Sequence, residues 1–266
     1  MHVTQPGEAR PAERAAADAV RAGVTRIAVL GGDGSCSQAV NGAYAAGGVD
    51  ALSRVRDYAR SAGIARDPVA AARALARGAA ARRVDVGRVQ FPDGRERLFL
   101  NVASFGISAQ IAHALEEYPQ LKRRAGALAF GLATVRAGAR YAPDETEIRV
   151  DLQAAQRGPT AAVAIANGGW FGGGMHVAPT ARLDDGLLEV VRFGDLARRD
   201  FLISLPRLYK GTHYTHPQVT HSRGAVIEAL PLGGATPRPI GIEADGELIG
   251  ALSARFSLVS GALTLA

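Results

Sequence analysis

The sequence predicts an α/β domain with a parallel sheet, followed by a β-rich domain that forms a sandwich or an open barrel. Near the N-terminus, a helical pattern, a β-branched strand, a glycine turn and a second helix follow one another, as they do in parallel α/β sheets. From about Val84 onward, short strand candidates separated by glycine and proline turns replace this pattern. We therefore expect an α/β domain over residues 1–96, a β-rich domain over 97–250, and one or more final strands over 251–266 that return to the first domain.

Three successive elements predict the first domain. Residues 11–23 gather small apolar side chains on one helical face and end at a glycine, which indicates a helix. Residues 24–30, "VTRIAVL", are rich in β-branched residues and predict a buried strand. A second helix is expected from near Ser35 to near Gly47, with Val40 facing inward. The glycines between strand and helix then lie at the carboxyl end of a strand, where such sheets place ligands.

Short alternating segments predict the β-rich domain. Strands "RVDVGRVQF" and "RERLFLNVASFG" meet at the turn "PDG", and a helical stretch runs from about Ile107 to Gly138. A second helix, "LARRDFLISLPRLYKG", interrupts the strands that follow. The remaining strand candidates are "TEIRVDL", "TAAVAIANGG", "GLLEVVRF", "QVTHS", "GAVIEAL" and "SARFSLV".

Composition excludes several classes of protein. The chain has 266 residues and 47% hydrophobic content, but no apolar run near the roughly 20 residues of a membrane-spanning helix. We see no signal peptide, and the single Cys36 cannot form an internal disulfide, so we expect a cytoplasmic protein. The net charge of +6 suits anionic partners. The arginines are scattered without interleaved aromatic residues, so we do not expect nucleic-acid binding.

The stretch "VLGGDGSCSQAVNG", residues 29–42, indicates a phosphate-binding turn. Glycines allow positive φ and close approach of the backbone, so their amides can bind phosphate oxygens beside the following helix N-terminus. Asp33 within this turn is suited to a nucleotide or to a magnesium ion on its phosphates. The combination favours phosphoryl transfer. A structural turn with an aspartate that caps the next helix would look similar.

Three later motifs, in this order, make the assignment more specific. They are "NVASFG" at 101–106, "NGGWFGGGMHVAPTARLDDGLLEVV" at 167–191 and "IEADGELIG" at 242–250. With the GGDG turn, they make the chain resemble the diacylglycerol kinase catalytic-domain family of lipid kinases, which includes sphingosine and ceramide kinases and bacterial relatives. The resemblance runs over nearly the whole chain. GGDG alone also occurs in NAD kinases, whereas the triple glycine, D-D-G-L and D-G-E together are more specific.

The resemblance implies that ATP binds between an α/β nucleotide domain and a β-rich lipid domain. It gives Asp33 and Glu247 catalytic roles, Asp33 through Mg²⁺ and Glu247 as general base for the lipid hydroxyl. Asp33 and Asp185 are implied as metal-binding residues. On the residues alone, without the joint pattern, the favoured interpretation would be a hairpin-turn residue for Glu247 and a loop cap for Asp185. The implied nucleotide-binding residues are Gly31, Gly32, Gly34, Ser35, Asn41 and Asp57.

Two departures from the family pattern stand out. The family usually opens with a strand and an N-P-x-x-G turn, and this chain begins after the place where they would lie. A P-x-G-T-x-N-D-x-A-R segment is expected to match "LSRVRDYARSAGI" at 52–64, where Ser53-Arg54 replace Gly-Thr. The stretch between Asn41 and Asp57 looks shortened, so we expect it to have lost its strand.

Our leading hypothesis is an ATP-dependent lipid kinase that phosphorylates a hydroxyl of diacylglycerol or a related lipid. Its partner would be a lipid substrate at the membrane surface, with the protein cytoplasmic or peripheral to the inner face of the membrane, and a homodimer is compatible with the sequence. One alternative is a catalytically impaired relative that binds lipid or a partner, and a second is an NAD kinase. Trp170 and Phe171 could line an acyl pocket, but we expect them to be buried in the domain core. The histidines at 213, 216 and 221 are close enough to suggest metal ligands, but we expect them to be structural.

Overall fold

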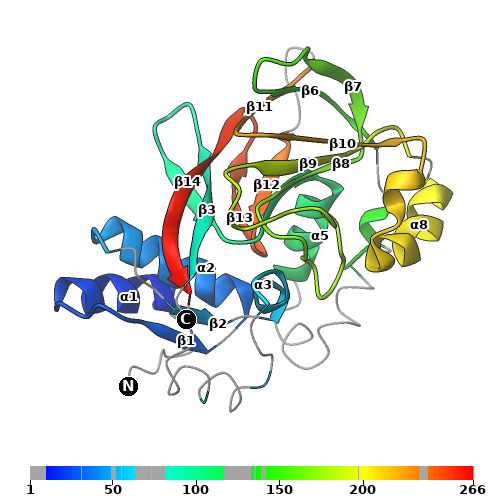
Figure 1. Cartoon of the computed structure of the whole chain (residues 1–266). Coiled ribbons are helices and arrows are strands. Elements are labelled where there is room, and N and C mark those ends of the chain that lie inside the picture. Colours follow the sequence, from blue (N-terminus) through cyan, green and yellow to red (C-terminus); the bar gives the residue numbers. More distant parts are fainter. Residues whose placement is uncertain are drawn as a thin grey trace.

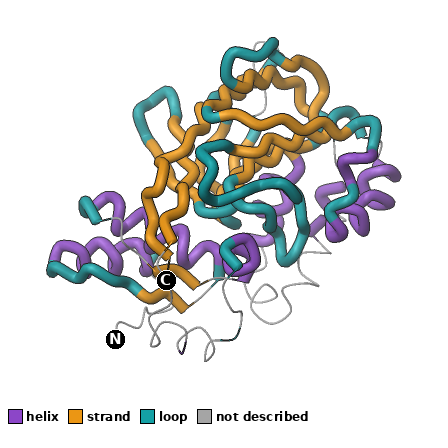
Figure 2. The backbone as a smooth tube through the Cα atoms, in the orientation of Figure 1, coloured by secondary structure: helices purple, strands orange, loops and turns teal. Residues whose placement is uncertain are grey.

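The protein combines a small α/β part with two stacked antiparallel sheets in a computed structural model (Figure 1). Figure 2 shows helices in the α/β part, the strands of the β-rich part, and further helices beside those strands. The structure describes residues 10–30, 32–48, 52–54, 56–63, 67, 73, 82–116, 133–134, 136–138, 142–196, 198–233 and 239–265.

The α/β part follows the predicted order of elements. It comprises α1 (Pro11–Arg21), β1 (Ala28–Leu30), α2 (Asp33–Ala45), β2 (Leu52–Arg54) and α3 (Arg56–Ser61). β1 and β2 pair in parallel. The expectation that the stretch after Asn41 has lost its strand is therefore wrong, because β2 lies within it. Helix α2 begins at Asp33, two residues earlier than the sequence pattern suggests.

Helices α1 and α2 pack closely at Gly42. A Cβ atom built on Gly42 would overlap the carbonyl group of Glu13 in α1. Only a residue without a side chain allows the two helix backbones to approach this far. The glycine of the "NG" pair is therefore needed for helix packing.

The β-rich part is a sandwich, which confirms the fold prediction. Every pair of neighbouring strands within each six-stranded sheet is antiparallel. Phe105 of the first sheet and Phe256 of the second meet between the layers, with ring centroids 6.4 Å apart. The first sheet has the order β10 (Val219–Gly224), β9 (Leu188–Phe193), β8 (Ala162–Ala166), β5 (Val102–Gly106), β12 (Gly241–Ala244) and β13 (Glu247–Ala251). The second has the order β4 (Glu96–Phe99), β3 (Arg82–Gln90), β14 (Ala254–Leu265), β11 (Val226–Pro231), β6 (Asp144–Val150) and β7 (Gln156–Thr160).

Strands β3 and β14 connect the sandwich to the α/β part. Val84 of β3 and Leu263 of β14 lie in one buried cluster with Cys36 and Val40 of α2 and Tyr58 of α3. The second sheet thus supplies part of the core of the α/β part.

Two helices flank the first sheet. Helix α5 (Ile107–Glu116) packs against β5, β12 and β13, and α8 (Arg198–Lys210) is followed by the short 3-10 helix η1 (His213–Thr215). Of the helical stretch predicted over 107–138, the structure describes α5 and helical residues at 133–134 and 136–138. Within the described residues, no helix is long and apolar enough to cross a membrane.

Candidate active site

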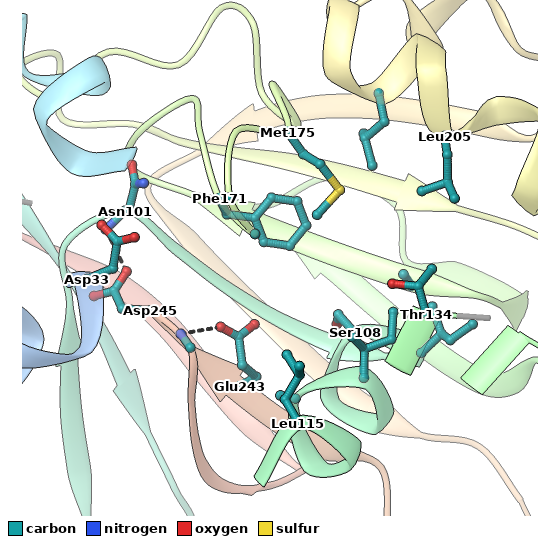
Figure 3. Close-up of a pocket in the computed structure, with 18 of the residues that line it drawn as sticks. Asp33, Asn101, Ser108, Leu115, Thr134, Phe171, Met175, Leu205, Glu243 and Asp245 are labelled. Carbon is teal, nitrogen blue, oxygen red and sulfur yellow. Dashed lines mark hydrogen bonds between the residues drawn. The ribbon is translucent and has the colours of Figure 1, made fainter. Parts of the chain in front are cut away.

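A cavity of about 690 Å³ lies where α2 meets the β12–β13 hairpin, and it extends between α5 and α8 (Figure 3). One end is polar and is formed by the start of α2, Asn101 and the hairpin. The other end is apolar. The polar lining comprises Gly32, Asp33, Gly34, Ser35, Gln38, Asn101, Glu243, Asp245, Gly246 and Glu247. The apolar lining includes Ile107, Ile111, Leu115, Phe171, Met175, Phe193, Leu196, Leu205 and Leu208.

The start of α2 presents backbone amides to the polar end. Gly32 caps the helix without a side-chain hydrogen bond, and a Cβ atom at this position would meet nothing within 4 Å. The first amides of a helix have no partner within the helix, and they favour an anion. Asp33 Oδ1 accepts a hydrogen bond from the Tyr58 amide, 3.3 Å away, which joins the turn to α3. Ser35 also lines the cavity, whereas Gly31 lies outside the described residues.

Glu247 lies directly beside this helix start. Its Oε1 is 3.4 Å from the position of a Cβ on Gly34, and it accepts a hydrogen bond from the side-chain Nε2 of Gln38. Its Oε2 is 3.9 Å from Arg97 Nη2 and 4.0 Å from Arg10 Nε. The fold therefore brings together Asp33 and Glu247, which the sequence places at opposite ends of the chain.

Asp245, in the same hairpin, is a cavity residue that the site prediction omitted. Its carboxylate accepts backbone hydrogen bonds from Leu100 at 2.6 Å, Asn101 at 3.0 Å and Val102 at 3.3 Å. Burial raises the pKa of Asp245 to about 6, although these hydrogen bonds oppose the rise. The D-G-E motif contained this residue, but a hairpin pattern does not reveal which carboxylate is buried.

Glu243 is a second cavity carboxylate that the prediction omitted. It is buried, and it accepts hydrogen bonds from the Ser104 hydroxyl at 2.6 Å and from the Gly246 amide. Figure 3 shows it between the polar group around Asp33 and the apolar side chain of Leu115. Because Glu243 binds the Gly246 amide, it helps to fix the turn that carries Glu247.

Asp185 lies apart from the cavity lining. Its Oδ1 accepts the Leu187 amide at 3.1 Å, and its other oxygen is paired with the Arg223 guanidinium. In the part of the chain that the structure describes, no group of three or more His, Cys, Asp or Glu side chains could hold a metal ion. Mg²⁺ needs only one or two protein carboxylates when nucleotide phosphates supply further oxygens. Asp33 therefore fits a metal that binds together with a nucleotide.

Asn41 also lies outside the cavity lining, and it joins α2 to the edge strand β4. Its Nδ2 donates to the carbonyls of Ser37 at 2.8 Å and Leu98 at 2.9 Å, while its Oδ1 accepts the Leu98 amide at 2.9 Å. This pairing satisfies backbone groups at the open edge of the second sheet. Asp57 belongs to α3, but its side chain lies outside the described residues.

The two aromatic residues of the triple-glycine segment have different surroundings. Phe171 is half-buried and lines the apolar part of the cavity. Trp170 stacks on His176 with ring centroids 3.9 Å apart, and the Arg60 guanidinium of α3 lies 5.2 Å from its ring. Trp170 therefore contributes to the contact between α3 and the sandwich.

The three histidines at 213, 216 and 221 have different surroundings. His213 is buried, its Nε2 lies 2.9 Å from the Val177 carbonyl oxygen, and burial lowers its pKa. His213 and His216 line the apolar half of the cavity, whereas His221 stacks on Tyr214. Two of the three histidines thus border the cavity, which the sequence pattern did not indicate.

Comparison with known proteins agrees with this architecture. The sequence profile of the diacylglycerol kinase catalytic domain matches residues 1–89. The profile described as the YegS C-terminal NAD kinase beta sandwich-like domain matches residues 101–266, more than half of the chain. The chain belongs to this family of lipid kinases. The resemblance noted in the sequence is thereby confirmed, and family membership implies ATP as a substrate.

Individual members of the lipid kinase family match most of the chain. A protein described as "Probable lipid kinase YegS-like" from Chromohalobacter salexigens is 32% identical, covering 95% of this chain and 79% of the relative. A diacylglycerol kinase from Mycobacterium tuberculosis is 28% identical, with coverage of 97% and 81%. A solved structure of a diacylglycerol kinase from Bacillus anthracis is 17% identical and superposes with a TM-score of 0.70, covering 99% of this chain and 84% of that one. The solved structure supports the fold.

Proposed function

We propose that the protein is an ATP-dependent kinase that phosphorylates a hydroxyl of diacylglycerol or a related lipid at the membrane surface. One observation carries the proposal. A single cavity has the glycine turn and Asp33 at its polar end, Glu247 beside them, and an apolar end between α5 and α8. Phosphoryl transfer to a lipid needs a phosphate site, a base and an apolar site for the lipid next to one another in one cavity.

The polar end would bind the ATP phosphates. The amides at the start of α2 and the positive end of the helix dipole suit the phosphate charge. Asp33 would hold a magnesium ion that arrives with the nucleotide. When bound, that ion supplies positive charge that offsets the charge on the transferring phosphoryl group. A metal role for Asp185 belongs to this proposal as well, and its pairing with Arg223 would have to give way.

Glu247 would activate the acceptor. The lipid hydroxyl oxygen forms a bond to the γ-phosphorus while the bond from that phosphorus to the bridging oxygen breaks, and ADP leaves with the electron pair. The hydroxyl proton passes to Glu247. The Glu247 carboxylate accepts a hydrogen bond from Gln38 and lies within ion-pair distance of Arg97 and Arg10. These contacts restrict its orientation, which suits a general base that takes the proton from one hydroxyl group.

The apolar end would hold the acyl chains. Side chains from α5, α8 and the triple-glycine segment line it, including Ile111, Leu208 and Phe171. A volume of about 690 Å³ falls within the range of about 300–1,000 Å³ typical of small-molecule sites. Only the first part of a long acyl chain needs to enter, since the remainder can stay in the bilayer.

Replacement of Glu247 by glutamine tests the proposal. The amide keeps the size of the side chain but cannot accept the hydroxyl proton, so kcat should fall roughly 10²–10⁴-fold. ATP binding should change little, because the start of α2 is intact. The assay measures transfer of labelled phosphate from ATP to short-chain diacylglycerol in the presence of Mg²⁺.

Glu228→Gln is the matched control, because Glu228 lies on β11 outside the cavity lining and its side chain is 42% exposed. It should retain full activity. Equal activity of both variants would contradict the role of Glu247. Wild-type protein that binds ATP but transfers no phosphate to any lipid would favour the non-catalytic alternative, and formation of NADP would favour an NAD kinase.

A further inference from the structure

Four charged side chains form a cluster beside the start of α2: Arg10, Glu13, Arg97 and Glu247. Arg97 of β4 lies at the centre of the cluster, and only 14% of its side chain is exposed. Its Nη1 donates to Glu13 Oε1 at 2.9 Å and to Oε2 at 3.0 Å, and its Nη2 donates to Oε2 at 3.0 Å. The distance from Arg97 Nη2 to Glu247 Oε2 is longer, 3.9 Å. Arg97 therefore binds Glu13 of α1 more closely than it binds Glu247.

Close packing around α2 fixes both partners of the Glu13–Arg97 ion pair. The carbonyl group of Glu13 lies against Gly42 of α2, where no side chain would fit. The residue after Arg97, Leu98, exchanges backbone hydrogen bonds with the side chain of Asn41 in the same helix. Because both backbones are held against successive residues of α2, the carboxylate and the guanidinium meet in a defined geometry.

Arg97 has the capacity to bind a second carboxylate. A guanidinium carries five N–H donors, and Arg97 Nε is buried without a hydrogen-bond partner among the described residues. Arginine pairs with carboxylates through two parallel hydrogen bonds of about 2.7–2.9 Å. If Glu13 released it, Arg97 would gain such a pair by turning toward Glu247. That pair would occupy the oxygen lone pairs that a general base needs for the acceptor hydroxyl.

We propose that Glu13 is a positioning residue that holds Arg97 away from Glu247, so that the Glu247 carboxylate stays available to the acceptor hydroxyl. Arg10 has a smaller part in the cluster, because 46% of its side chain is exposed and solvent screens its charge. The inference rests on the proposed role of Glu247 as the base. The hold on Arg97 itself can be tested without catalysis.

The kinetics of Glu13→Ala test the proposal. Alanine favours the helical conformation of α1 and removes the hydrogen-bond acceptor, so Arg97 should turn to Glu247. We expect kcat to fall roughly 10–100-fold, because a charge-assisted hydrogen bond must break before Glu247 can take a proton. The KM for ATP should change little, since the start of α2 is intact. Glu13→Asp, which keeps a carboxylate, should retain more activity than Glu13→Ala.

A second substitution separates this effect from the simple loss of an ion pair. Arg97→Gln alone should lower kcat by no more than about 5-fold, since a partly exposed ion pair at 3.9 Å contributes little. The double variant Glu13→Ala, Arg97→Gln has no Arg97 guanidinium to bind Glu247, so its kcat should recover to that of Arg97→Gln. If the two residues only stabilised the fold, the double variant would be no more active than Glu13→Ala.

Asp18→Ala is the matched control. Asp18 is another acidic residue of α1, it pairs with Arg21 at 3.0 Å, and it lies outside the cavity lining. The substitution changes the net charge by the same amount as Glu13→Ala, and it should leave kcat at the wild-type value. Thermal melting checks that each variant is folded at the assay temperature.

A crystal structure of Glu13→Ala provides a measurement that needs no catalysis. We expect the shortest distance between the Arg97 guanidinium and the Glu247 carboxylate to fall from 3.9 Å to about 2.7–2.9 Å. An unmoved Arg97, an unchanged kcat in Glu13→Ala, a double variant that does not recover, or an equal loss in Asp18→Ala would overturn the proposal.

The two proposals can fail separately. If Arg97 turns to Glu247 in the Glu13→Ala crystal structure but the wild type has no kinase activity, the proposed function is refuted and the hold on Arg97 stands. If Glu247→Gln abolishes activity while Arg97 keeps its place in Glu13→Ala, the hold is refuted and the proposed function stands.

Discussion

The buried carboxylate of Asp245 makes the stability of the protein depend on pH in a direction that can be worked out. Burial raises its folded-state pKa from an ordinary 3.8 to about 6. The folded state therefore binds the proton more tightly than the unfolded state does. The stability contributed by this group is fully present below pH 3.8 and is lost as the pH rises through about 6.

The size of the effect follows from the two pKa values. Each tenfold difference in proton affinity is about 1.4 kcal/mol, so the loss between low and neutral pH is about 3 kcal/mol. Asp245→Asn removes this dependence because an amide does not titrate in this range. The amide can no longer accept all three backbone hydrogen bonds, and one unsatisfied donor costs roughly 1–3 kcal/mol. We expect the variant to be less stable near pH 4 and to match or exceed the wild type at pH 7.

Urea unfolding followed by the fluorescence of the single tryptophan, Trp170, provides the assay. The quantity of interest is the difference in unfolding free energy between wild type and variant at several pH values, in which the other titrating groups cancel. Asp93→Asn provides a control, because the Arg95 side chain lowers the pKa of the exposed Asp93. The difference in unfolding free energy between wild type and this variant should therefore change with pH in the opposite direction. A difference for Asp245→Asn that stays constant to within about 0.5 kcal/mol from pH 4 to 7 would refute the reasoning.

Two further predictions concern α2. Asn41→Ala should lower the unfolding free energy by about 1–3 kcal/mol, because the Leu98 amide loses its buried acceptor; the KM for ATP should hardly change, and a large rise in KM with unchanged stability would instead support a nucleotide contact. Gly42→Ala should destabilise the protein by about 1–3 kcal/mol in thermal or urea unfolding, because the new methyl group overlaps the Glu13 carbonyl. Gly32→Ala, where the space is open, is the control and should unfold like the wild type.

The sequence predicted the fold best where a few neighbouring residues determine the local structure. Turn chemistry and a change of hydrophobic period place the glycine turn at the start of α2, to within two residues of the observed first residue, Asp33. Strand β7 was not predicted, because "QRGPT" contains glycine and proline and has little strand propensity. It forms nevertheless at the edge of the second sheet, where Pro159 removes no hydrogen bond that an inner strand would need.

The site was harder to predict because its geometry depends on the whole topology. Nothing local relates Glu247 to Gly34, and the resemblance to a family supplied that pairing. The sequence also could not distinguish the buried Asp245 from the more accessible Glu247, since both occur in one tight turn. Asn41 follows the motif that was expected to bind nucleotide, but its amide pairs with an edge strand, and an asparagine within a helix carries no signal that separates these two uses.

Strand β14 has a mechanical consequence for how the α/β part and the sandwich can move relative to one another. It pairs with β3 from Arg255 in the sandwich to Leu265 beside the α/β part, with a register shift between Val259 and Leu263. The two parts are thus joined by a hydrogen-bonded ribbon in addition to any covalent tether. Any opening between the two parts must bend this pair of strands or break its hydrogen bonds. The segment between Val259 and Leu263 has the fewest paired residues, so it should bend most easily.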